Sequence, residues 1–155
     1  IDLINKKLKQ NFSTTSQRII QENLNACSIE TNKNNPNIVV LASTKPLLSP
    51  NSSSWAGQLL NRFNINSLTK DLDSKSEFKG YANLSPEWLL KTDPDNLVLI
   101  ETRPGQFNDF SNSKPFSSLN AVKSDKIYSF NYYGLINPGS LKSINNACEK
   151  LKEII

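Results

Sequence analysis

The sequence predicts an α/β protein, a three-layer sandwich with a mostly parallel central sheet, preceded by a long helix. Two short apolar runs carry this prediction, Asn37–Ala42 and Asn96–Ile100. Such runs are typical of strands buried on both faces of a parallel sheet. Segments with apolar residues at helical spacing precede, separate and follow them, so helices and strands alternate along the chain. The 155 residues suit a single domain.

The first 28 residues have the pattern of one amphipathic helix. Their apolar residues recur at spacings of three, four or seven: Ile1, Ile4, Leu8, Phe12, Ile19, Ile20, Leu24 and Cys27. If continuous, about 27 residues would span roughly 40 Å. Ser13–Ser16 has weaker helix propensity and could introduce a kink. The polar segment Thr31–Pro36 ends the pattern.

The next part begins with the strand Asn37–Ala42, and we expect a long loop from Ser43 to Ser54. The polar residues Asn51–Ser54 offer an N-cap for a following helix. Its buried side is expected to contain Trp55, Leu59, Leu60 and Phe63. Asn64–Leu68 is expected to form a short strand, and residues 69–80 a polar loop.

A second helix is predicted at Ser85-Pro86-Glu87, because serine caps helices, proline suits the first position and a carboxylate favours the positive end. Asp93–Asp95 would end it before the strand Asn96–Ile100. Glu101–Ser113 is expected to be loop, and Lys126–Phe130 a third strand. The last predicted helix follows Pro138-Gly139-Ser140 and buries Leu141, Ile144, Ala147, Cys148, Leu151, Ile154 and Ile155.

This order of elements also predicts where a ligand would bind. In open parallel sheets, ligands bind outside the carboxyl ends of the strands. Here those ends lead into Ser43–Trp55, Glu101–Phe110 and Asn131–Gly139.

Composition argues against several classes of protein. The chain has no histidine, which removes His-dependent nucleophile systems and imidazole metal ligands. It has no phosphate-binding glycine loop and no recognisable catalytic carboxylate pair, so we predict neither catalytic residues nor a metal site. The net charge of +4 is scattered, which disfavours nucleic acid as a partner. Cys27 and Cys148 could form a disulfide or remain two buried thiols.

Three ordered segments resemble the substrate-binding proteins of iron-siderophore, haem and cobalamin ABC importers. The first, Ser85–Asp95 with the strand Asn96–Ile100, resembles their S-x-E-x-L-L-x-x-x-P-D signature. Leu119–Tyr128 is similar to their L-x-A-V-K-x-G-K-V-Y segment, with Asp125 where glycine is usual. Pro138-Gly139-Ser140 and its helix resemble their C-terminus, although an arginine common there is absent.

The resemblance implies a division of the chain. Residues 1–30 would be the helix that connects two lobes, and residues 31–155 the C-terminal substrate-binding lobe, with the N-terminal lobe absent from this sequence. The protein would then be a monomeric, non-enzymatic component of an importer, without a cofactor of its own. It would be periplasmic or otherwise extracytoplasmic, with a lipid anchor as one option, and would deliver an iron chelate to ABC permease subunits. Cobalamin or haem as the ligand, or an unrelated α/β nucleotide-binding or enzyme domain, are the alternatives.

The resemblance and side-chain chemistry together nominate site residues. Glu87 matches the family's glutamate that docks to permease arginines; otherwise it only favours the helix dipole. Bulky chelates need aromatic walls and a cation, and the residues nominated for this role are Trp55, Arg103, Tyr132, Tyr133 and Lys45. Trp55 could instead cap the core, and Arg103 could be a surface residue. Because neighbouring residues of an extended chain face opposite ways, only one of the two tyrosines is expected to face the cleft.

Overall fold

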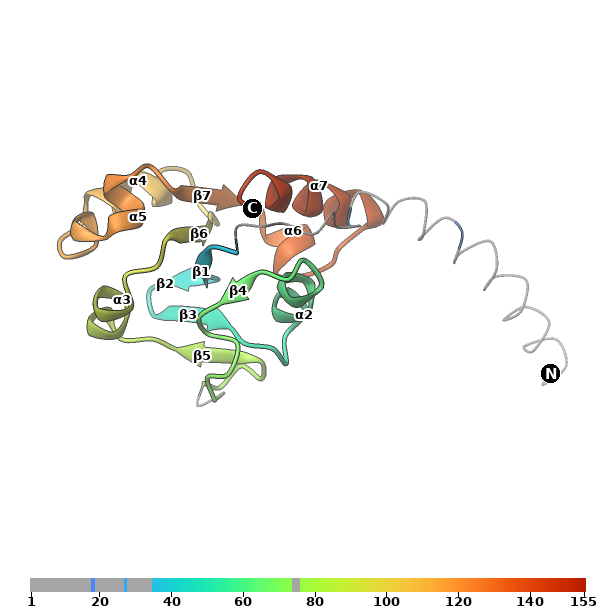
Figure 1. Ribbon diagram of the computed structural model, residues 1–155, viewed down its shortest axis with the longest axis horizontal. Coiled ribbons are helices and arrows are strands. Elements are labelled where there is room, and N and C mark those ends of the chain that lie inside the picture. Colours follow the sequence, from blue (N-terminus) through green and yellow to red (C-terminus); the bar gives the residue numbers. More distant parts are fainter. Residues whose placement is uncertain (1–17, 19–26, 28–34, 74–75) are drawn as a thin grey trace, which may run out of the picture.

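The computed structural model describes residue 18, residue 27 and residues 35–73 and 76–155. The predicted helix over residues 1–30 therefore lies outside the described residues, apart from Arg18 and Cys27. The main sheet contains β1 (Asn37–Leu41), β4 (Asn66–Ser67), β6 (Asn96–Ile100) and β7 (Ile127–Phe130). Their order is β4-β1-β6-β7, and every pair is parallel (Figure 1).

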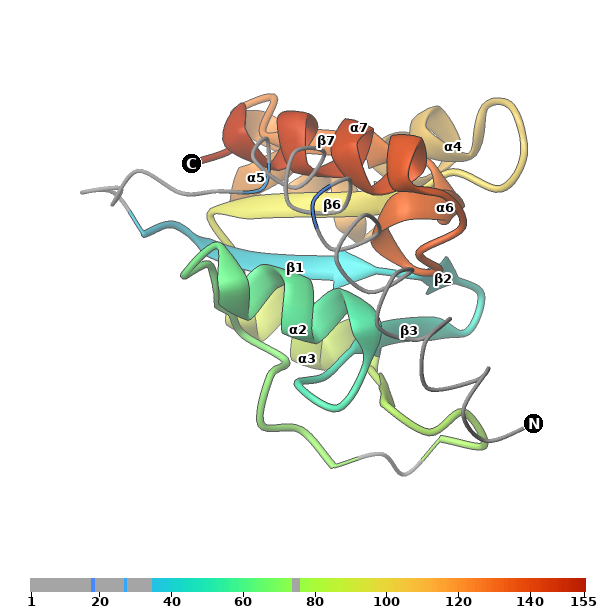
Figure 2. The ribbon, with the colours of Figure 1, turned by 90° about the vertical axis from the view of Figure 1, so that its right-hand side faces the viewer.

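Helices cover both faces of this sheet, which confirms the predicted three-layer sandwich. One face is covered by α2 (Trp55–Arg62), α6 (Tyr132–Leu135) and α7 (Leu141–Lys152). The other is covered by α3 (Pro86–Thr92), α4 (Gln106–Asn112), the 3-10 helix η2 (Phe116–Ser118) and α5 (Asn120–Lys123). The two groups lie on opposite sides of the sheet in Figures 1 and 2.

Side chains point alternately to the two faces of the sheet along each strand, and this creates two separate hydrophobic cores. Ile38 and Val40 pack with α2, α6 and α7, whereas Val39 and Leu41 pack with residues of α3, α4 and α5. The same alternation divides Leu97–Ile100 of β6. Successive side chains of a strand point to opposite faces, so a strand that is apolar at every position must be covered on both.

The predicted helix starts are confirmed by serine caps. The hydroxyl of Ser54 accepts a hydrogen bond from the backbone N–H of Gly57 at 2.9 Å. The hydroxyls of Ser85 and Ser140 accept in the same way from Trp88 and Ser143, each at 3.1 Å. These bonds satisfy N–H groups that have no partner within the helix.

A second, antiparallel sheet replaces part of a predicted loop. It contains β2 (Ser43–Thr44), β3 (Leu47–Pro50) and β5 (Tyr81–Asn83), in the order β2-β3-β5. The prediction of loop over Ser43–Ser54 was therefore wrong for its first half, and that over Glu101–Ser113 was wrong where α4 forms. Both elements depend on tertiary partners: Leu48 pairs with the distant Asn83, and α4 starts at Gly105 without a side-chain cap.

The Asp93-Pro94-Asp95 turn connects parts of the fold that are distant in sequence. Asp93 ends α3 in the left-handed conformation, and its carboxylate accepts a hydrogen bond from the backbone N–H of Asn120 at 2.8 Å. The carboxylate of Asp95 accepts from the backbone N–H of Asn37, the first residue of β1, at 3.0 Å. Both carboxylates thus organise the backbone.

A buried hydroxyl cluster supports the segment that precedes α2. Thr69 donates a hydrogen bond to the carbonyl of Pro50 at 2.8 Å, and the Ser49 hydroxyl donates to Thr69 at 2.9 Å. The Ser67 hydroxyl lies 3.2 Å from the same threonine oxygen. All three side chains are buried, so their polar atoms depend on one another for hydrogen bonds.

The structure joins Cys27 and Cys148 by a disulfide, with their Cα atoms 5.1 Å apart. Of the two alternatives for these cysteines, the structure therefore contains the bonded one. The bond links residue 27 to α7 across 121 positions of sequence. Within the described residues, no helix is both long enough and apolar enough to cross a membrane.

Candidate functional site

Three loops meet at the carboxyl edge of the parallel sheet. Leu41 of β1 lies opposite Leu99, and Ile100 of β6 lies opposite Phe130 of β7, so the three strands end nearly level. The segments that follow them are the β2–β3 hairpin, the loop into α4, and the turn that contains α6. Figure 2 shows these segments gathered at the right-hand end of the sheet.

The described residues include three exposed large apolar side chains. They are Phe78, Tyr132 and Tyr133, which are 61%, 43% and 61% exposed. Tyr132 and Tyr133 begin α6 and lie on this edge, whereas Phe78 lies in the loop before β5. Single exposed aromatic residues are common, but a group on one edge marks a surface for binding.

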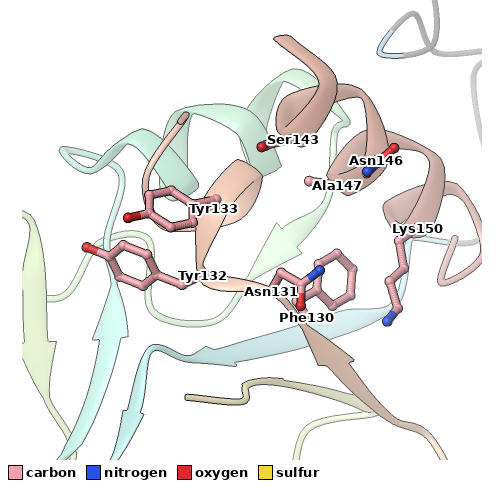
Figure 3. A pocket seen from close by; sticks show the side chains of 8 residues that line it. All are labelled: Phe130, Asn131, Tyr132, Tyr133, Ser143, Asn146, Ala147 and Lys150. Carbon is pink, nitrogen blue, oxygen red and sulfur yellow. The ribbon is translucent and has the colours of Figure 1, made fainter. Parts of the chain in front are cut away.

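Tyr132 and Tyr133 line the same hollow, of about 420 Å³. Figure 3 shows both rings extending to one side of α6, whereas Ser143, Asn146 and Lys150 of α7, which line the same hollow, lie on the other side. That only one tyrosine faces the ligand cleft stays a prediction, although both side chains line this hollow. The chain does not continue as a strand after β7: it turns at Gly134, with φ 102°, and the two rings meet edge to face at 5.3 Å.

Gly134 is required at this turn for a second reason. A Cβ atom at this position would lie 2.1 Å from the carbonyl oxygen of Ser143, so the α6 turn can pack closely against α7 only with glycine. This contact fixes where the two tyrosines stand relative to α7.

Trp55 holds the turn from the other side. Its indole N–H donates to the carbonyl oxygen of Gly134 at 3.0 Å, and its half-buried ring packs against the core between α2 and the sheet. The residue therefore caps the core, which was the alternative weighed for it, and leaves only part of its ring at the edge.

Tyr81 is a residue of this edge that the sequence did not reveal. It begins β5 and is half-buried against the same core as Trp55. Burial raises the pKa of the Tyr81 phenol, and the nearby Tyr132 adds to the rise. Tyr81 thus places a protonated phenol beside Tyr132 and extends the aromatic wall. It is brought there by pairing between β3 and β5, which has no local signal in the sequence.

Lys45 and Arg103 line a different hollow, of about 80 Å³, between the β2–β3 hairpin and α4. The guanidinium of Arg103 donates to the Asp109 carboxylate at 2.6 Å, and both side chains are more than half exposed. The structure therefore brings the two predicted cations together, and it separates them from the two tyrosines. Asp109 was not foreseen as a partner of Arg103.

Glu87 is exposed in the first turn of α3. Because Asp95, just after this helix, binds the first residue of β1, the end of α3 lies at the amino edge of the sheet. The first turn therefore lies nearer the carboxyl edge, on the side of the candidate site.

Glu101 was missed by sequence reasoning although it directly follows the apolar run of β6. It is half-buried at the centre of the edge, and its carboxylate accepts from the Ser129 hydroxyl at 3.1 Å. Within the described part of the chain, no cluster of three or more histidine, cysteine, aspartate or glutamate residues is arranged to hold a metal ion.

Comparison with known proteins identifies the fold. No family model and no curated protein matches the sequence. Solved structures do match, and one is a possible iron-binding periplasmic solute-binding protein from Staphylococcus epidermidis, with a TM-score of 0.65 and 16% identity. The chain has the fold of one lobe of the periplasmic binding proteins. The alignment covers 96% of this chain and 55% of that one.

Two further matches share this lobe. The periplasmic vitamin B12 binding protein of Vibrio cholerae has a TM-score of 0.58 at 18% identity. A binding protein of Bacillus subtilis, described as a component of a ferrichrome ABC transporter, has the same values. The alignments cover 96% of this chain in both cases, with 54% of the Vibrio cholerae protein and 55% of the Bacillus subtilis protein. The chain thus spans about half the length of the structures it matches, and the predicted resemblance is confirmed for the fold.

Proposed function

We propose that this chain is the C-terminal substrate-binding lobe of a solute-binding protein that serves an ABC importer. The observation that carries the proposal is the carboxyl edge of the sheet, where exposed aromatic side chains and a pair of cations surround the strand ends of a periplasmic-binding-protein fold. The disulfide between Cys27 and Cys148 supports an oxidising, extracytoplasmic location. We expect a monomer, with a lipid anchor as one means of retention.

The proposed ligand is a ferric chelate of the siderophore kind. Tyr132, Tyr133 and the exposed part of Trp55 would contact its apolar surface, and Lys45 with Arg103 would contact its anionic oxygens. The chain has no histidine to bind a bare zinc or manganese ion, which favours a metal that arrives already chelated. Cobalamin and haem are the alternative ligands.

A binding experiment tests this proposal in a protein that carries this lobe together with its amino-terminal partner. The chain has two tryptophans, and the variant Trp88→Phe leaves Trp55 as the reporter at the candidate site. Ferric hydroxamate, cobalamin and haemin are titrated separately, by tryptophan fluorescence and by calorimetry, because two of these ligands absorb strongly. Saturable binding with a Kd of about 1 μM or tighter is expected for the ferric chelate. Failure of all three to bind would refute the proposed function.

The proposal assigns Glu87 to the contact with the permease. An exposed carboxylate on the first turn of a helix is held rigidly and can form charge-assisted hydrogen bonds with an arginine of the partner. The position of this turn near the carboxyl edge supports the assignment, because a permease that receives the ligand must approach from that side.

A further inference from the structure

The loops that bear Lys45 and Arg103 are joined by one buried side chain. Gln106, the first residue of α4, is only 7% exposed. Its carboxamide oxygen accepts hydrogen bonds from both the backbone N–H and the hydroxyl of Thr102, each at 3.0 Å. Its amide nitrogen donates to the Thr44 hydroxyl at 3.2 Å. A single side chain thus holds the residue before Arg103 and the residue before Lys45.

This connection is important because the hairpin is otherwise only lightly attached. β2 has two residues and lies at the edge of the small sheet, where β3 is its one strand partner. Among the described residues, the bond from Gln106 to Thr44 is the one side-chain hydrogen bond recorded between this hairpin and the loop into α4. Lys45 is exposed at the turn of the hairpin, so its position depends on how the hairpin sits.

The hollow between the two loops has the charge and size to receive an anionic group. Lys45 and Arg103 contribute two positive charges and Asp109 one negative charge, which leaves a net charge of +1. The Arg103–Asp109 ion pair is solvated and weak, and a guanidinium has five N–H donors, so Arg103 can bind a second anion. The volume of about 80 Å³ exceeds the roughly 30 Å³ share of a water molecule and suits a carboxylate.

We propose that Gln106 is a positioning residue that sets the spacing of Lys45 and Arg103, so that the two cations together bind a carboxylate of the ligand. This inference rests on the proposed solute-binding function and adds to it a class of ligand, a chelate with a free carboxylate. Gln106 also lines the hollow, but its role in this proposal is to hold the two loops at a fixed spacing.

The test uses this chain with citrate as the probe and the neutral triethyl citrate as its uncharged counterpart, followed by NMR of the backbone amides. In the wild type, citrate should produce saturable shifts at Thr44, Lys45 and Thr102, and the ester should not. Gln106→Leu should weaken citrate binding about tenfold, the loss expected for one good hydrogen-bond connection. The same substitution at Gln58, exposed on α2, is the matched control and should change nothing.

A second pair of variants keeps the test decisive if Gln106→Leu does not fold. Thr44→Val removes the acceptor for Gln106 and should weaken citrate binding as much, whereas Thr44→Ser keeps the hydroxyl and should bind as the wild type does. Equal citrate affinity in Thr44→Val and Thr44→Ser would overturn the positioning role. The absence of localised citrate shifts in the wild type would overturn the anion site, whereas the proposed function is judged by chelate binding in the two-lobe protein.

Discussion

Replacing Thr69 by valine is expected to lower the free energy of unfolding by about 3–5 kcal/mol. Valine matches threonine in shape but has no hydroxyl, so the carbonyl of Pro50 and the hydroxyls of Ser49 and Ser67 each lose their bond to this residue. A buried polar group left without a partner costs about 1–3 kcal/mol, and some re-pairing of the serines keeps the sum below its maximum. A domain of this size has a total stability of about 5–15 kcal/mol, so the effect is large.

Urea unfolding followed by tryptophan fluorescence measures this loss. With a slope of about 2 kcal/mol per M, the midpoint should fall by about 1.5–2.5 M while the slope stays constant. Thr69→Ser is the control, because it keeps the hydroxyl and removes one methyl group, at a cost of about 1 kcal/mol. If Thr69→Val were no less stable than Thr69→Ser, the hydroxyl cluster would not support the fold in the way described.

Four further predictions follow from other contacts. Cys148→Ser should lower the free energy of unfolding by about 4–5 kcal/mol in urea melts, because the disulfide closes a 121-residue separation; equal stability of the oxidised wild type and the variant would contradict this. Above about pH 10, urea melts should show the wild type losing stability relative to Tyr81→Phe. Because the pKa of Tyr81 is raised, the folded state holds the phenol proton more tightly than the unfolded state does. The stabilising contribution of Tyr81 is therefore complete below the pKa of the unfolded state and disappears as the pH rises through the pKa of the folded state. A difference that stays constant with pH would show that Tyr81 is not perturbed. Asp125→Gly should raise the midpoint of thermal unfolding and add about 0.5–1 kcal/mol, since Asp125 has a φ of 54°; a loss of stability would mean that its side chain matters more than its backbone. In the two-lobe protein, Glu87→Ala should weaken binding to the permease about tenfold or more in a pull-down titration, whereas Glu149→Ala on α7 should not, and equal effects would remove the docking role.

The parts of the fold that were predicted correctly have causes within a few neighbouring residues. β1 and β6 are apolar at nearly every position because both faces of the sheet are covered. Such an apolar run can be recognised in the sequence without knowing which distant residues pack against it. Ser54, Ser85 and Ser140 cap their helices through bonds to residues three positions ahead. The left-handed backbone of Asp125 also explains why glycine is usual at this position in the family that the sequence resembles.

The parts that were missed depend on residues far apart in the sequence. β2 is too short to show any periodicity, and β5 becomes a strand because Ala82 pairs with Ser49 of β3. The placement of the site residues was harder still. The sequence identified Lys45 and Arg103 separately, but not that Gln106 would join their loops. It nominated Tyr132 and Tyr133, but the turn at Gly134 that brings both to one hollow follows from close packing against α7.

The disulfide changes what a protease can do to this protein. Because it joins residue 27 to residue 148, any single cut of the backbone between them leaves two pieces that remain covalently attached. A cut in the exposed Thr102–Gly105 segment, for example, would add the mass of one water and release nothing. The nicked chain would run as one band without reductant and as two with it. The two fragments would thus remain in one molecule after cleavage, so that their strands could pair again as before.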